Sequence, residues 1–460
     1  MVTRTGSQDP GDDRAGGAQG SRRGIALALP WQRLRQSLLA RNAAWLTVGQ
    51  GGLKVLQATY FVVIARTLGA GGLGAFAAAT ALSQLIAPMA GLGAGNVLIQ
   101  HVARRREAFD HYWGGALTLT LMAGAISVGA AALVGRALLP ATIPTSLVIC
   151  VATSDLVFAT VLFLCGQAYQ AQEKMARTAQ LPIVTTFLRL VAAVAFVATP
   201  GAHTAAAWGY YYLACTALST ATALWLTSRE LGRPVIRFNY TTRDVRDGFF
   251  FATGISAQNV YNDIDKVMLG RLVPDLSATG IYSAAYRVID VLLVPIRSIG
   301  QAAYPKFFKH GAHGVRSSVK VAQQLLPPAV SYGALAGIAM FLVAPLLPHL
   351  LGHDFDQAAG AVRWLSLLPV LKSVQFAAAD ALTGAGFQAT RTLLQVIVAA
   401  INIGINFPLI THYSWRGAAW SSLICDGLLS VTLWVLIFHL RKRADDRTPA
   451  PVPESETVSL

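Results

Sequence analysis

The sequence predicts an all-helical, polytopic membrane protein with about twelve transmembrane spans, and three observations support that prediction. Of the 460 residues, 54% are apolar and only 13% are charged, whereas roughly a quarter of the residues in a soluble chain are charged. The charged residues cluster between long stretches that carry almost none. Lys and Arg also alternate between abundant and scarce from one connecting segment to the next. Much of the surface must therefore face lipid.

The long apolar stretches place the individual spans. A helix needs about 20 predominantly apolar residues to cross the ~30 Å hydrocarbon core of a bilayer. Six such windows precede a basic segment at 229–246 and six follow it, the seventh being the most polar. The windows lie at 43–65, 73–99, 112–135, 143–168, 179–199, 202–227, 247–270, 277–303, 321–346, 357–383, 392–411 and 415–440.

The distribution of Lys and Arg gives the topology. With a cytoplasmic N-terminus, 26 of these residues fall in inside segments and four, Arg66, Arg136, Arg271 and Arg416, fall in outside loops. Basic residues are retained on the cytoplasmic side, so both termini are predicted to be cytoplasmic. The net charge of +15 then lies where the anionic lipids of the inner leaflet attract it. Membrane lipids, and not nucleic acid, are the predicted partner of the basic residues.

Motifs of catalysis and metal binding do not occur in a convincing context. All four cysteines lie inside apolar windows without CxxC or Cys/His spacing, which favours a packing role. Gly69, Gly71 and Gly74 spell G-x-G-x-x-G, but this string follows a membrane span where a dinucleotide site requires a strand. Ser/His/Asp, Walker and HExxH arrangements are missing. The sequence therefore predicts no enzyme, no cofactor and no metal site.

The two sets of six windows repeat the same motifs in the same order, which predicts two homologous lobes. Six spans per lobe make the repeats parallel, related by an axis along the membrane normal, with a central cavity between them. The motifs are an outer Arg followed by a glycine (Arg66 and Gly74; Arg271 and Gly280), a G-x-x-x-Q-A string (from Gly166 and from Gly384) and Ala-Ala-Trp (ending at Trp208 and Trp420). The predicted domains are a disordered basic cytoplasmic tail (1–40), the N-terminal lobe (41–230), a cytoplasmic linker (231–246), the C-terminal lobe (247–441) and a cytoplasmic tail (442–460).

Several strings are typical of one family of membrane proteins. They are Ile64-Ala-Arg-Thr-Leu-Gly69 with Gly74-Ala-Phe, Asn262-Asp-Ile-Asp265-Lys-Val-Met-Leu-Gly270, Gly280-Ile-Tyr-Ser-Ala-Ala-Tyr286-Arg and Tyr304-Pro305. These strings resemble the polysaccharide-biosynthesis flippase family of the multidrug/oligosaccharidyl-lipid/polysaccharide exporter superfamily, and the resemblance covers nearly all of 41–440. It implies a multi-pass protein of the bacterial inner membrane that flips polyprenyl-diphosphate-linked oligosaccharide by alternating access, for lipopolysaccharide or exopolysaccharide synthesis. A proton or sodium ion is the implied coupling ion, and polysaccharide polymerase and export proteins are the implied protein partners.

Thirteen ionisable residues fall inside the predicted spans. Each costs about 2.5–3.5 kcal/mol at a helix centre, so together they predict a hydrated interior. Gln258, Asn262 and Asp265 share one helical face at i, i+4 and i+7. The thirteen are Lys54, Arg189, Lys266, Arg287, Arg297, Arg363, Lys372, Asp155, Asp263, Asp265, Asp290, Asp380 and Asp426.

Two interpretations of these charges stay open. In the functional one, Lys and Arg bind the diphosphate through charge-assisted hydrogen bonds, and a carboxylate titrates as access alternates. In the structural one, Arg287–Asp290, Lys266–Asp263 and Arg189–Asp155 are ion pairs that hold helices in register; Asp155, Arg189 and Asp426 are assigned this role. The substrate-binding candidates are Lys54, Arg287, Arg297, Arg363, Lys372 and Asn262, and the ion-coupling candidates are Asp265, Asp290 and Asp380.

Two rival functions remain. A multidrug/cation antiporter of the same superfamily would have a cavity dominated by carboxylates and aromatic residues, whereas this sequence places slightly more cations in its spans. A membrane glycan polymerase or ligase would need a large outer loop with a catalytic Arg or His, and every predicted outer loop is short.

Overall fold

The structure, a computed structural model, describes residues 38–104, 107, 109–234, 242–311 and 314–446. The predicted N-terminal tail lies outside the described residues except for its last three, which begin the first helix. Most of the predicted C-terminal tail and residues 235–241 of the linker also lie outside them. The described chain is helical along almost its whole length, as expected where lipid leaves backbone groups no partner but each other.

In the first half, helices cover each of the six predicted windows. The first two windows share α2, which changes direction at Gly69, where φ is 66° and ψ is 178°. Glycine adopts this conformation without steric cost, so Gly69 forms the turn between two spans. The helices are α2 (Leu38–Gly91), α3 (Ala94–Arg104), α4 (Phe109–Leu138), α5 (Thr145–Ala152), the π-helix η2 (Thr153–Ala159), α6 (Thr160–Ala171), α7 (Met175–Ala198) and α8 (Ala205–Glu230).

The second half covers the other six windows. Two of its spans are bent: α10 meets α11 at 46°, and α14 and α15 belong to a pair bent by 45°. Among the described residues, seven helical stretches are long and apolar enough to cross a membrane, or nine if each bent pair is one span. The helices are α9 (Thr242–Leu272), α10 (Ser277–Leu292), α11 (Val294–Gly311), α12 (Val315–Val343), α13 (Leu346–Leu351), the 3₁₀-helix η3 (His353–Phe355), α14 (Ala358–Leu365), α15 (Leu368–Gly384), α16 (Gln388–Tyr413) and α17 (Trp415–Asp446).

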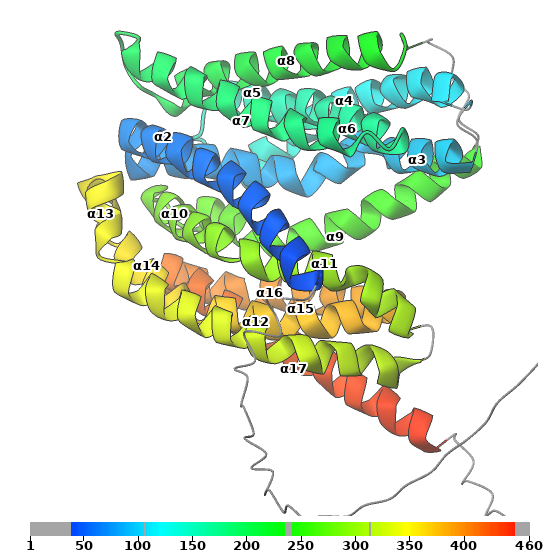
Figure 1. Cartoon of the computed structure of the whole chain (residues 1–460). Coiled ribbons are helices and arrows are strands. Elements are labelled where there is room, and N and C mark those ends of the chain that lie inside the picture. The colour runs from blue at the N-terminus through cyan, green and yellow to red at the C-terminus, as the bar shows by residue number, and fades with distance from the viewer. Residues whose placement is uncertain (1–37, 105–106, 108, 235–241, 312–313, 447–460) are drawn as a thin grey trace, which may run out of the picture.

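The predicted count of about twelve spans agrees with this helix order. The apolar stretch Gly51–Val102 has 52 residues and covers two windows, while α8 and α9, with 26 and 31 residues, are long enough for the remaining two. In Figure 1 the turns after α3, α8 and α11 lie at one end of the molecule and α13 lies at the other. The turns at the first end carry the basic residues predicted to be cytoplasmic, so we call it the inner end and the opposite one the outer end.

The helices form two stacked lobes, with α2 and α9 packed against each other between them (Figure 1). Small residues let these lobes approach closely at the outer end. A Cβ on Gly74 would lie 1.8 Å from the backbone oxygen of Leu276, and one on Gly280 would lie 2.1 Å from that of Ala70. Such contacts are typical of membrane helices, which associate by close packing of small residues. The outer ends of the lobes are therefore tightly joined.

An arginine reinforces this outer contact. Arg66 donates from Nε to the backbone oxygen of Leu350 at 2.6 Å and from Nη2 to that of His349 at 2.7 Å. Both carbonyls belong to the last turn of α13, where helix carbonyls have no partner within the helix and a cation is favourable. Asp354, just beyond α13, lies close enough to Gly69 that a Cβ there would be 2.6 Å from its Oδ2. We call this contact between α2 and the α13–η3 segment the outer gate.

The glycine contact makes a direct prediction. Gly74→Ala places a methyl group against a backbone carbonyl that can move only with its helix, so we expect overpacking that costs about 1–3 kcal/mol and lowers the Tm of the purified protein in detergent. Gly71→Ala is the matched control, because no atom lies within 4 Å of a Cβ at that position. Equal Tm values for the two variants would contradict the account of the lobe contact.

Candidate functional site

A polar cavity lies within the C-terminal lobe. It has a volume of about 750 Å³ and is lined by residues of α9, α10, α11, α15, α16 and α17. The sequence predicted a cavity between the two lobes, and the structure places this one to one side of that interface. Four cations and four carboxylates line it: Lys266, Arg297, Lys372 and Arg391, and Asp263, Asp290, Asp380 and Asp426.

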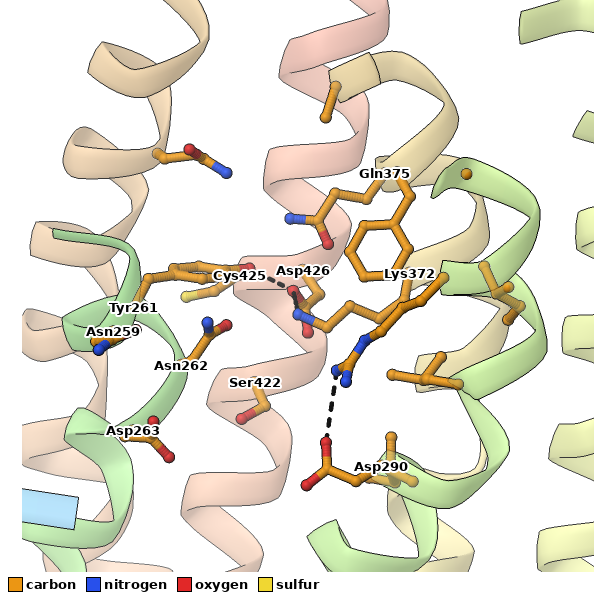
Figure 2. Close-up of a pocket in the computed structure, with 18 of the residues that line it drawn as sticks. Asn259, Tyr261, Asn262, Asp263, Asp290, Lys372, Gln375, Ser422, Cys425 and Asp426 are labelled. Atoms are coloured by element: carbon orange, nitrogen blue, oxygen red, sulfur yellow. Dashed lines mark hydrogen bonds and ion pairs between the residues drawn. The ribbon is translucent and has the colours of Figure 1, made fainter. Parts of the chain in front are cut away.

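The most buried charge pair in the cavity joins α15 to α17. Lys372 Nζ lies 2.6 Å from Asp426 Oδ1, and their side chains are only 12% and 4% exposed. Tyr261 of α9 donates its hydroxyl hydrogen to the same carboxylate oxygen, and the two donors converge on Asp426 in Figure 2. A carboxylate buried to this degree needs such partners, because several kcal/mol of hydration are lost. The pair therefore fixes three helices around the cavity.

A second pair is much looser. Arg297 of α11 approaches Asp290 of α10 at 3.4 Å, with side chains 41% and 36% exposed, and the contact is drawn in Figure 2. Exposed pairs of this kind contribute under about 1 kcal/mol, so an incoming anion can displace Asp290 from Arg297 at little cost. Lys266 of α9 forms a third pair with Asp263 one turn earlier and lies 5.1 Å from the centre of the Tyr286 ring.

Asp265 is held just behind the cavity wall. Its side chain is 4% exposed, and its Oδ2 accepts the hydroxyl hydrogen of Tyr282. Ser422 of α17 lies 3.4 Å from the same oxygen, and the backbone N–H of Lys266 donates to Oδ1 at 2.8 Å. Asp265 is not among the cavity-lining residues, although Ser422 and Lys266, which contact it, both are.

The sequence analysis missed a residue at the inner end of the cavity. Arg391 was counted as part of a cytoplasmic loop because the predicted span began one residue later. It lies in the first turn of α16, lines the cavity and donates from Nη1 to Thr383 Oγ1 at 2.7 Å. Its charge interacts with that of Asp380 on α15. The i, i+4 relation between Arg391 and Gln395, a second lining residue of α16, is the signal that could have identified it.

The structure divides the nine predicted site residues into two groups. Asn262, Arg297, Lys372, Asp290 and Asp380 line the cavity, whereas Lys54, Arg287, Arg363 and Asp265 do not. Lys54 of α2 is half-buried, and its charge interacts with those of Asp290, Arg287 and Arg297.

The two arginines outside the cavity stack on aromatic rings. Arg287 is exposed and lies 5.4 Å from the centre of the Phe61 ring of α2. Arg363 is exposed on α14, 5.3 Å from the Phe341 ring. Stacking on an aromatic face leaves the guanidinium edge available to other partners.

One of the three predicted ion pairs forms. Lys266–Asp263 is present, but Arg287 turns to Phe61 and Asp290 pairs with Arg297 instead. Arg189 and Asp155 make no direct ion pair among the described residues, although their charges act on each other. Asp155 accepts from the Tyr212 hydroxyl at 2.8 Å, and Arg189 lies over the Tyr212 ring, 4.6 Å from its centre.

Comparison with known proteins decides the family. The model of the family described as polysaccharide biosynthesis protein matches residues 39–310, more than half of the chain. The chain belongs to this family. No curated protein sequence matches it. The match runs through the first half and into α11 of the second, so it includes the α2 side of the outer gate and the part of the cavity wall formed by α9, α10 and α11.

Solved transporters share the fold of this family member. An inward-facing multidrug resistance MATE transporter of the MOP superfamily aligns with a TM-score of 0.69 at 17% identity, over 88% of this chain and 100% of that one. An outward-facing MATE structure gives 0.61 at 16% identity, over 88% and 96%. A MOP superfamily transporter from Pyrococcus furiosus, whose binding pocket is described as having reverse polarity, gives 0.63 at 16%, over 90% and 98%. Family and fold together indicate a multi-pass membrane protein of the polysaccharide-biosynthesis family that has the fold of these transporters.

The Lys372–Asp426 pair carries a prediction about stability. Lys372→Met removes the cation and leaves a buried carboxylate held by Tyr261 alone, so we expect a loss of about 3–5 kcal/mol, measured as a lower Tm in detergent. Adding Asp426→Asn to that variant removes the stranded charge and should recover most of the loss. If the double variant is as unstable as the single one, Asp426 is not stabilised by Lys372.

Proposed function

We propose that this protein flips polyprenyl-diphosphate-linked oligosaccharide across the bacterial inner membrane for the synthesis of surface polysaccharide. The proposal rests on the cavity of the C-terminal lobe. Carboxylates in its wall neutralise its cations, and one of the pairs, Arg297–Asp290, is weak. A charged cavity of this kind suits an anionic ligand that exchanges with internal carboxylates. Family membership supplies the link to polysaccharide biosynthesis.

Arg297 is the cation best placed to take up the diphosphate. A diphosphate carries about two negative charges and binds Arg through short, charge-assisted hydrogen bonds. Its partner Asp290 lies at 3.4 Å in a half-exposed pair, whereas Lys372 is held by Asp426 at 2.6 Å in a buried one. Exchange therefore costs less at Arg297. Lys54 and Arg287, beside the cavity on α2 and α10, add positive potential to the same region.

The sugars would bind the uncharged polar side chains of the cavity. Asparagine, glutamine and tyrosine offer the donors and acceptors that hydroxyl groups need. A cavity of about 750 Å³ lies within the usual range for sites that enclose small ligands. It would enclose the diphosphate and nearby sugars, while the polyprenyl tail stays in lipid between the lobes. The uncharged polar lining residues are Asn259, Tyr261, Asn262, Tyr286, Gln301, Tyr304, Gln375, Gln395, Asn402 and Ser422.

Transport would proceed by opening the outer gate. The cavity extends to Tyr304 and Arg391 at the inner ends of α11 and α16, while Arg66 and the packed glycines join the lobes at the outer end. The arrangement thus suits loading from the cytoplasmic side. Asp290 and Asp380 on the cavity wall, and Asp265 behind it, are the carboxylates proposed to exchange a proton or sodium ion as the lobes move. Polysaccharide polymerase and export proteins would take up the product outside.

The function is tested first in a deletion strain. Polyprenyl-linked glycans are extracted, and their exposure on each leaflet is measured with a membrane-impermeant sugar-modifying enzyme. We expect lipid-linked glycan to accumulate on the inner leaflet while surface polysaccharide is lost. Normal lipid-linked glycans together with altered sensitivity to cationic drugs would contradict the proposal and favour the multidrug antiporter.

Arg297→Gln should prevent complementation of that strain. The substitution removes the diphosphate partner but breaks only a weak, half-exposed pair, so we expect at least a tenfold loss of surface polysaccharide with normal protein in the membrane. Arg271→Ala, an exposed arginine in the last turn of α9, is the control and should complement fully. Full complementation by Arg297→Gln would exclude Arg297 from substrate binding.

Arg66→Ala should weaken the outer gate. The substitution removes two hydrogen bonds to α13, so the outward-open population should rise. A cysteine introduced at the exposed cavity residue Asn262 in a cysteine-free background should then react faster with an impermeant maleimide added from outside. An unchanged labelling rate would show that Arg66 does not hold the gate.

A further inference from the structure

A second polar cavity lies at the outer end of the C-terminal lobe, where three connecting segments meet. It has a volume of about 430 Å³, which lies within the usual range for ligand sites. Its wall comes from the turn between α9 and α10, the residue before α14, and the turn between α16 and α17. We call it the outer cavity. Its polar and aromatic lining residues include Asp275, Gln357, His412, Tyr413, Trp415 and Arg416.

The turn between α16 and α17 is held in place by close packing. Ser414 has φ of 55° and ψ of −135°, a conformation that residues other than glycine seldom adopt. A Cβ on Gly417 would lie 2.0 Å from the backbone oxygen of Leu409, so α17 begins in direct contact with the end of α16. Trp415 Nε1 donates to Gln357 Oε1 at 2.7 Å and joins this turn to the start of α14. The wall of the outer cavity is therefore formed before a ligand binds.

Opposite charges line the outer cavity without pairing with each other. Asp275 and Arg416 are both lining residues, but no ion pair among the described residues joins them. Asp275 instead accepts from the backbone N–H of Ser277 at 2.9 Å and from the Ser277 hydroxyl. Arg416 lies 5.3 Å from the centre of the Trp415 ring, and a guanidinium stacked on a ring keeps its N–H edge available. The two charges cancel, so the cavity suits a polar ligand without net charge.

These side chains favour a saccharide over a phosphate group. Hydroxyl groups donate and accept, so a sugar can bind Arg416 and Asp275 at the same time. A phosphate would gain one cation and be repelled by the carboxylate beside it. Tyr413 is 51% exposed, and with Trp415 it provides an aromatic surface for the apolar face of a sugar ring, together with a hydroxyl group.

The outer cavity continues the path of the cavity in the C-terminal lobe. Residues of α10, α16 and α17 line both. On α17, Trp415 of the outer cavity lies seven residues before Ser422 of the other cavity, a rise of about 10 Å at 1.5 Å per residue. A glycan that extends outward along these helices therefore reaches the outer cavity next.

Two segments of its wall also contact α2 at the outer end. Leu276, between Asp275 and Ser277, presents its backbone oxygen to Gly74. Asp354, three residues before Gln357, faces Gly69. Opening the outer end separates α2 from both segments, so a sugar bound in the outer cavity lies beside the exit.

We propose that the outer cavity is a saccharide-binding site that receives sugar units of the glycan as they leave the cavity of the C-terminal lobe. Arg416 and Asp275 bind the sugar hydroxyls, and Tyr413 and Trp415 contact the ring. The inference deepens the proposed function and rests on it for the source of the sugar, whereas sugar binding itself rests on the outer cavity alone.

Protection of an introduced cysteine tests this site without any transport. His412→Cys lies in the cavity wall, and Thr411→Cys, exposed in the same turn of α16, does not. Each is introduced into the full-length, cysteine-free protein, and labelling by a maleimide is timed with and without oligosaccharides released from the surface polysaccharide of the same bacterium by partial acid hydrolysis. We expect the labelling rate of His412→Cys to fall roughly tenfold, because a pocket encloses most of its ligand, and that of Thr411→Cys to stay unchanged.

Arg416→Ala, added to His412→Cys, should abolish the protection. Arg271→Ala is the matched control, because Arg271 is an exposed arginine in the last turn of α9 that does not line the outer cavity, and it should leave the protection intact. A His412→Cys labelling rate that the oligosaccharides leave unchanged would overturn the proposal, as would protection that survives Arg416→Ala.

Two further outcomes separate this site from its alternatives. Protection by inorganic phosphate and not by the oligosaccharides would overturn the proposal in favour of an anion site. Because the purified protein transports nothing in this assay, protection in a protein whose deletion strain shows no flipping defect would count against the proposed function alone.

Discussion

Charged side chains that are buried inside the protein need a counter-charge beside them, and the arrangement of the C-terminal cavity follows from that requirement. An ionised side chain in hydrocarbon costs at least about 2.5–3.5 kcal/mol. Lys372 meets the requirement by binding Asp426 at 2.6 Å between two helices. Arg297 meets it only partly, at 3.4 Å from Asp290. The difference separates a pair that holds helices together from one that can give up its carboxylate to a ligand.

Close helix packing supplies the second part of the mechanism. Gly74 and Gly280 bring two backbones into contact at the outer end, and Arg66 joins the same region to α13 through carbonyls that the helix leaves free. Opening the outer end requires these contacts between α2, α10 and α13 to separate. The cavity meanwhile reaches the inner ends of α11 and α16. Charge pairing and outer packing thus act on different parts of the molecule.

The span pattern was predictable because apolar length and basic residues act along the sequence. Helices cover all twelve windows, and Gly69 forms the turn between the first two spans. The partners of individual side chains were less predictable, because a long side chain can reach residues on several helices. Arg287 lies one turn before Asp290 yet stacks on Phe61. Asp290 pairs instead with Arg297, seven residues later in the chain. Arg391 was missed because the window limit fell one residue too late. That Asp155 Oδ2 is buried without a hydrogen-bond partner among the described residues depends on contacts that only the folded chain defines.

The central claim is that a diphosphate-linked glycan exchanges with the carboxylates of the cavity, and reconstituted flipping tests it most directly. Purified protein is placed in liposomes containing a polyprenyl-diphosphate oligosaccharide with a fluorescent sugar, and the loss of fluorescence to an impermeant quencher is followed. The account predicts transfer faster than in protein-free liposomes, with competition by unlabelled diphosphate-linked glycan and not by a cationic dye. Transfer no faster than in protein-free liposomes, with proton-driven uptake of the dye instead, would contradict it.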